Sequence, residues 1–237
     1  MTAAVFQSTV NVTLSFGVVG ELIVDGPQRA ESLTLDTNGG TIGYGFTKSN
    51  STNVATMGGT IANGVVFAGI LANPKTYASF GAVSGNPIDP NLFLPANSQG
   101  EFLTMGTIIV ASGSAGNIGD LVQFNNTTGA ISTLPPTSTF TASQATTVLT
   151  VTGTPTGNLG VGADVYSTTG VFIGKIESLG TGTGGAGTYN LTTSATVSSE
   201  AMTANTQPAS GNQFVPNAVI YRFPTSASGL IAIRMTE

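Results

Sequence analysis

The stretch VNVTLSFGV, residues 10–18, gives the clearest indication of how this chain folds. Its apolar residues alternate with Asn, Thr, Ser and Gly along the whole stretch. Side chains of a β-strand point alternately to opposite faces, so this pattern predicts a strand with one buried face. No charged residue and no proline lies between Thr2 and Val19. We therefore expect the backbone edge of this strand to be open to pairing.

Short apolar runs bounded by turn-forming residues recur along the rest of the chain. The first follows Glu21 and ends before Gly26-Pro27. Others lie at residues 65–71, 102–110, 121–124, 148–151, 171–176, 189–191, 218–221 and 230–235. Helical patterns are weak, and the best helix candidate, residues 28–35, would make only about two turns. The sequence predicts an all-β protein, with a β-sandwich or barrel-like host domain that carries an extended N-terminal strand.

The composition changes in the second half of the chain. Thr, Gly and Ser dominate residues 137–205, which follow Pro135-Pro136 and precede the turn-rich stretch at residues 207–212. Insertions are tolerated at exposed turns, where the two chain ends lie close together. We therefore expect a small β module at residues 137–205, inserted into a host domain made of residues 1–136 and 206–237.

Charged residues are scarce, and this scarcity excludes several functional classes. Charged residues make up 7% of the chain, against about 25% in ordinary soluble proteins. The net charge is −5, and the basic residues lie singly along the sequence at Arg29, Lys48, Lys75, Lys175, Arg222 and Arg234. Binding to nucleic acid needs a basic face, so we expect no nucleic-acid partner. We also expect no membrane partner and no signal peptide, since the chain has no long apolar run and no basic segment at its start.

Residues that usually carry catalysis or bind metals are missing or dispersed. The chain has no Cys and no His, which excludes disulfides, zinc sites built from these residues and His-dependent triads. Glu101 and Asp120 are the best-placed carboxylates, but their spacing gives no support for a catalytic pair. The glycine-rich stretch at residues 180–185 precedes a strand pattern, which favours a turn over a dinucleotide site. A faint calcium-loop pattern at residues 36–40 lacks the remaining ligands. We expect no enzymatic activity, no cofactor and no required metal.

Several segments together carry a resemblance to a known family. They are FQSTVN (residues 6–11), DGPQRA (25–30), QGEFLTMG (99–106) and AVIYR (218–222), with residues 20–21, 67–75 and 119–129. In this order they resemble the structural cement, or head decoration, proteins of tailed bacteriophages, over most of the expected host domain. Residues 137–205 are similar to small β modules of phage tail and head appendage proteins. Simpler cement proteins lack such an insertion, so it is open whether the module contacts capsid, projects outward or binds cells.

The resemblance implies a virion structural protein on the outer surface of the capsid. Such a protein adds to a preformed shell, bridges neighbouring major capsid protein subunits and stabilises the head. Its partners would be the major capsid protein and copies of itself, as a dimer or trimer. A tail fibre or receptor-binding virion protein is the alternative. Fibres usually contain repeats or coiled-coil heptads, and the sequence shows neither.

We expect the contacts with capsid or neighbouring subunits at two kinds of site. An N-terminal strand with an unpaired edge suits strand addition to a partner sheet. Arg29 follows the Gly26-Pro27 turn, which should project it outward, and Lys75 ends an apolar run. In a chain with so few charges, each cation is either part of a structural ion pair or an interface anchor, and the sequence leaves both open. The predicted interface residues are Phe6, Val10, Val12, Leu14, Arg29 and Lys75.

Overall fold

The computed structural model describes residues 17–73 and 92–236. These residues form β-strands and no helix, so the all-β prediction is confirmed. No helix long and apolar enough to cross a membrane is found within these two ranges. Most of the strand predicted at residues 10–18 lies outside the described residues.

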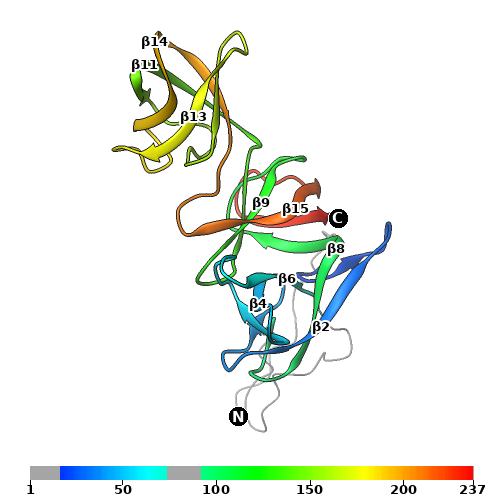
Figure 1. Ribbon diagram of the computed structural model, residues 1–237. Helices are drawn as coiled ribbons and strands as arrows, with labels where there is room; N and C mark the ends of the chain where they lie inside the picture. Colours follow the sequence, from blue (N-terminus) through cyan, green and yellow to red (C-terminus); the bar gives the residue numbers. More distant parts are fainter. Residues whose placement is uncertain (1–16, 74–91, 237) are drawn as a thin grey trace, which may run out of the picture.

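The long strand β8 (Gln99–Ser112) belongs to two closed rings of strands (Figure 1). The first ring, a five-stranded barrel, continues from β8 through β16 (Gly229–Met235), β15 (Asn212–Arg222), β9 (Leu121–Asn125) and β10 (Ile131–Leu134). The second continues through β2 (Arg29–Leu35), β5 (Val54–Met57), β4 (Gly45–Ser49) and β6 (Val65–Leu71). The short strand β1 (Leu22–Ile23) pairs with β8, and β3 (Gly40–Thr41) pairs with β7 (Phe93–Leu94). We call the two rings the double barrel.

Each ring encloses its own apolar core, because inward side chains of its strands meet across it. Ile108 and Val110 of β8 are buried in the first ring with Ile231 and Ile233 of β16. The second core contains Phe102 of β8, whose ring meets that of Phe46 edge to face at 5.1 Å. Such aromatic pairs stabilise by about 0.5–1.5 kcal/mol beyond their burial.

Residues 29–35, within the best helix candidate, form strand β2, in keeping with the all-β prediction. Leu33 and Leu35, two positions apart, are both buried in the second core. That spacing puts both side chains on one face of a strand, whereas residues two apart point in different directions on a helix. The antiparallel ladder with β8 also supplies backbone partners, from Arg29 opposite Met105 to Thr34 opposite Gln99.

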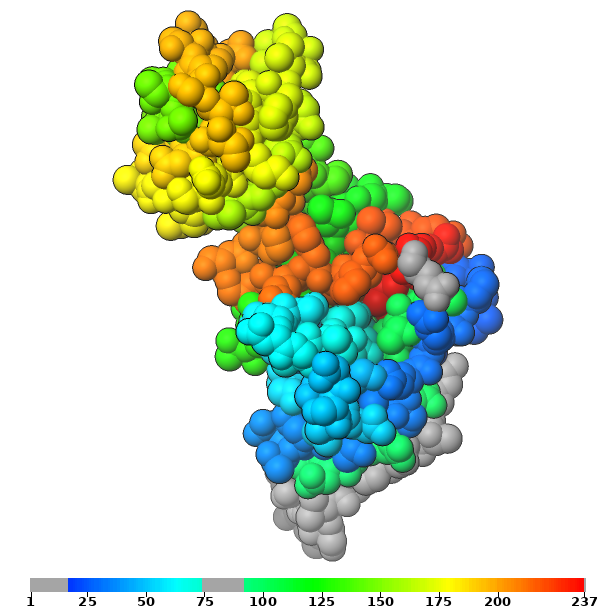
Figure 2. Space-filling view, viewed as in Figure 1, coloured from blue at the N-terminus to red at the C-terminus, as the bar shows by residue number. Residues whose placement is uncertain are grey.

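Residues 137–205 contain a separate four-stranded sheet. It consists of β11 (Thr137–Thr152), β14 (Gly187–Asn205), β12 (Asp164–Ser167) and β13 (Phe172–Leu179). Its core cluster draws every member from within this segment. The segment's ends lie side by side, since Thr137 pairs with Asn205 and Thr206 N–H donates to the Pro136 carbonyl (3.1 Å). Figure 2 shows the segment as a lobe at one end of the molecule.

Candidate interaction surface

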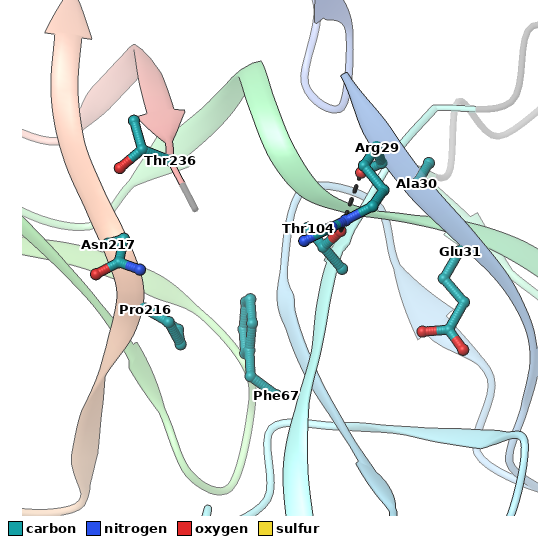
Figure 3. A pocket seen from close by; sticks show the side chains of 8 residues that line it. All are labelled: Arg29, Ala30, Glu31, Phe67, Thr104, Pro216, Asn217 and Thr236. Carbon is teal, nitrogen blue, oxygen red and sulfur yellow. Dashed lines mark hydrogen bonds between the residues drawn. The ribbon is translucent and has the colours of Figure 1, made fainter. Parts of the chain in front are cut away.

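A cleft of about 640 Å³ opens where the two rings of the double barrel meet (Figure 3). Arg29, Ala30 and Glu31 of β2 and Phe67 of β6 line it from the second ring. Pro216 and Asn217 of β15 line it from the first ring, with Thr104 of β8 and Thr236 after β16. The cleft therefore combines apolar walls with a charged rim.

A bulge in β15 shapes one wall of the cleft. Phe214 lies opposite Gln123 of β9, but the next pair joins Val219 to Leu121, so extra residues of β15 project from the ladder. Pro216 has no N–H to donate to a ladder, and prolines inside sheets are confined to edges and bulges. Asn217 takes a left-handed conformation (φ 50°), and its carbonyl accepts a hydrogen bond from Thr236 N–H (3.1 Å). The projecting turn is thereby fixed against the C-terminal strand.

The other wall contains an unpaired strand edge. β6 pairs with β4 along most of its length, but with β8 only at Ile70 and Leu71. Within the described part of the chain, no strand pairs with the second edge of β6 before Ile70. Phe67 lies on this stretch and its ring packs at 5.6 Å from that of Phe124. Unpaired edges accept strands from other proteins, so this wall suits strand addition.

Arg29 lies exposed on the rim of the cleft, at a bulge where β2 meets β8. Its Nε donates to Thr104 Oγ1 (3.4 Å), and that hydroxyl donates to the Arg29 carbonyl (3.1 Å). Nearby, Lys48 donates to both carboxylate oxygens of Glu31, so this cation belongs to an ion pair. Phe6, Val10, Val12, Leu14 and Lys75 lie outside the described residues. The interface role of all six predicted residues stays a prediction.

A cluster of charged groups that sequence reasoning missed lies beside the cleft. Asp25 Oδ2 is 2.8 Å from Arg234 Nη2 and 3.6 Å from Arg222 Nη2, while Thr107 Oγ1 donates to Oδ1 (2.9 Å). The Arg234 guanidinium carbon is 3.4 Å from the centre of the Tyr221 ring. The basic residues lie singly along the chain, but the fold brings two of them together. No local sequence pattern signals this, because Asp25 and Arg234 are near opposite ends of the chain.

The surroundings of Asp25 keep its carboxylate ionised. Partial loss of hydration would raise its pKa, but hydrogen bonds from Thr107 and Arg234 and the charges of both arginines lower the pKa below the ordinary 3.8. Hydrogen bonds from Arg222 and Arg234 likewise hold the pKa of the Tyr221 hydroxyl below its usual value of 10.0. The cluster thus holds two guanidinium charges against one carboxylate.

A smaller hollow of about 260 Å³ adjoins this cluster. Arg234 and Asp25 line it together with the apolar residues Pro27, Met105 and Met235. Thr236 lines both this hollow and the cleft, so the two form one continuous surface. We call it the C-terminal face.

The acidic residues considered above as catalytic or calcium-binding candidates lie on a strand or in turns. Glu101 is exposed on β8, opposite Ser32 of β2. Asp120 accepts a hydrogen bond from Asn117 N–H (2.8 Å), which closes the turn before β9. Asp36 accepts one from Asn38 N–H (2.8 Å), as in an ordinary Asx turn. Over residues 17–73 and 92–236, no three His, Cys, Asp or Glu side chains are grouped as metal ligands.

The glycine-rich stretch at residues 180–185 lies in the connection between β13 and β14. Gly184 N–H donates to the buried Tyr189 hydroxyl (3.1 Å), which donates to the Gly185 carbonyl (2.6 Å). The stretch therefore wraps a tyrosine of the four-stranded sheet, and a strand follows it.

Comparison with known proteins relates the chain to phage capsids. The family model described as "Structural cement protein (E217 gp24/Pam3 gp6)" matches residues 6–164. One solved structure, "The capsid of Myoviridae Phage XM1", contains a chain of 14% sequence identity, with 98% of each chain covered and a TM-score of 0.47. At that TM-score the likeness supports no argument by itself. The search of curated proteins found no match. Because the family model matches well over half of the residues, this chain belongs to the phage structural cement protein family, whose members are capsid-associated structural proteins.

Proposed function

We propose that this protein binds the outer surface of the phage capsid, bridges neighbouring major capsid protein subunits and stabilises the head. Membership of the structural cement family is the observation that carries the proposal. The low charge content of 7% supports it, since such a surface repels adjacent chains weakly. Copies of the protein would also contact one another as a dimer or trimer.

The C-terminal face and the N-terminal segment are the proposed contact sites. The unpaired edge of β6 and the apolar wall around Phe67 suit an extended segment of a neighbouring subunit. Arg29 on the rim would fix such a segment through a carboxylate. Phe6, Val10, Val12 and Leu14, with Lys75, are proposed from the sequence pattern alone. A modest contact repeated over a shell gives substantial total reinforcement.

The direct test adds the purified protein to undecorated heads. We expect saturable binding, seen as a decorating layer by cryo-electron microscopy, and survival of decorated heads at temperatures that break bare ones. Failure to bind heads, or localisation on the tail, would overturn the proposal.

Separate variants test the proposed contact sites. Deletion of residues 1–9 and, separately, Arg29→Ala should each weaken binding to heads, while Lys175→Ala in the four-stranded sheet should not. Circular dichroism checks that each variant is folded. Wild-type binding by both test variants would remove these residues from the interface and leave the cement function standing.

A further inference from the structure

Positive charge is concentrated on the C-terminal face of an acidic molecule. The described part of the chain contains five basic residues, and all except Lys175 lie on or beside this face: Arg29, Lys48, Arg222 and Arg234. Among the described residues, Lys48 pairs with Glu31, and Arg222 and Arg234 share Asp25. Lys175 pairs with Asp164 in the four-stranded sheet. The described part of this face thus gathers most of the chain's basic residues, although the whole chain carries −5.

Arg222 and Arg234 are held in place before any partner arrives. Both guanidinium groups lie over the Tyr221 ring, at 4.7 Å and 3.4 Å from its centre. Asp25 bonds directly to Arg234 at 2.8 Å, whereas Arg222 is 3.6 Å away, beyond normal hydrogen-bond length. The Arg222 side chain is 46% exposed. The two guanidinium groups share one carboxylate, so some of their N–H donors remain for a second carboxylate.

The adjoining hollow favours a protein side chain over other anions. Met105 and Pro27 give it apolar walls, and Arg234 stands at its edge. The methylene groups of a glutamate would pack on these walls while its carboxylate meets a guanidinium in a charge-assisted, bidentate bond. A nucleic acid needs a longer row of cations to bind its phosphates, and this cluster contains only two arginines.

From these observations we infer that Arg222 and Arg234 form a docking point for a carboxylate side chain on an acidic segment of the capsid shell. This inference rests on the proposed cement function and names the chemistry of the partner at one place. Asp25 and Tyr221 position the arginines. Arg222 is more exposed than Arg234 and lies farther from Asp25. Its contact therefore contributes most to the affinity for the partner.

The test compares binding of charge variants to undecorated heads over a range of salt concentrations. Arg222→Glu should weaken binding about tenfold or more, because it places a carboxylate against the partner's own. Arg222→Gln should weaken binding less and should flatten its salt dependence. Lys175→Gln removes the same charge far from the C-terminal face and should bind like the wild type. Thermal unfolding of each variant checks the fold.

The outcomes separate this inference from the function on which it rests. If the wild type binds heads and Arg222→Glu binds with equal affinity and salt dependence, the docking point is refuted while the cement function stands. If Arg222→Glu is unfolded, Arg222→Gln decides, since Asp25 keeps Arg234 and Thr107 as partners. Unchanged affinity and salt dependence in Arg222→Gln then refute the docking point as well. If the wild type does not bind heads, both proposals fall.

Discussion

At the scale of single residues, Asp25 connects parts of the chain that are far apart in sequence. It joins the turn after β1 to Arg234 of β16, Arg222 of β15 and Thr107 of β8. Without its charge, the two guanidinium groups would lose the carboxylate that they share among the described residues. Asp25 therefore stabilises the end of the double barrel that carries the C-terminal face.

Asp25 should make stability depend on acid pH. Its pKa is lowered in the folded state, so its contribution is present above the ordinary value of 3.8 and is lost as pH falls through the folded value. We expect Asp25→Asn to be less stable than the wild type near neutral pH, and the difference to shrink below about pH 4. Urea unfolding at several pH values measures this. A difference that stays constant down to acid pH would show that the ion cluster is not its source.

Tyr189 gives a second prediction at this scale, in the four-stranded sheet. Its side chain is fully buried, and its hydroxyl bonds both Gly184 N–H and the Gly185 carbonyl. Tyr189→Phe would leave both backbone groups without this partner, at a cost of about 1–3 kcal/mol. Tyr166→Phe, at a partly exposed tyrosine, is the control and should change the unfolding free energy little. Equal effects of the two substitutions in denaturant unfolding would contradict the structural role of the buried hydroxyl.

At the scale of elements, β6 depends on one glycine. Gly69 has φ +129°, and a Cβ there would be 2.7 Å from the Leu103 carbonyl oxygen of β8. It lies beside a register shift, where Phe46 faces Gly69 but Thr47 faces Phe67. The close approach lets β6 join β4 and β8 at one end while its other end stays open along the cleft.

Gly69→Ala should therefore be destabilising. The conformation disfavours any L side chain and the new methyl would meet rigid backbone, so we expect a loss of roughly 1–3 kcal/mol or more. Gly26→Ala is the matched control, because its Cβ would meet no atom within 4 Å. We expect that control to stay within about 0.5 kcal/mol of the wild type. Thermal or urea unfolding compares them, and a tolerated Gly69→Ala would mean that β6 can shift away from β8.

At the scale of the whole molecule, residues 137–205 form a lobe with its own core (Figures 1 and 2). The core clusters of the double barrel contain no residue from this segment. Polar contacts join the lobe to the segment that follows it, where Asn158 Nδ2 donates to the Gln207 and Pro208 carbonyls. Removing the segment would expose little of the double-barrel core.

We predict that residues 137–205 are a separable module. Because Thr137 and Asn205 are paired neighbours, a short Gly-Ser linker can replace the segment at small entropic cost. The shortened protein should unfold cooperatively and keep its β-type circular dichroism. Loss of the folded signal would mean that the lobe is required for the double barrel, and that the boundary predicted from composition does not mark a domain.

Local patterns in the sequence were sufficient for the all-β class. Strand periodicity and β-branched residues act within a few positions, so the all-β class could be predicted without long-range information. The change to Thr, Gly and Ser at residues 137–205 coincides with the start of β11 and the end of β14. At residues 28–35, the best helix candidate, pairing with β8 and burial of Leu33 and Leu35 outweigh a weak local preference.

The candidate surface depends on contacts that only the tertiary structure decides. Strand register and ring closure place β8 in two rings and make Pro216 project from a bulge. They also bring Asp25 to Arg222 and Arg234. Register couples residues far apart in the chain, and a shift of one position would turn each side chain to the other face. The sequence by itself therefore determined the all-β class and the scarcity of charge. The meeting of the charges on one face was decided by the fold, because no local interaction links residues 25, 222 and 234.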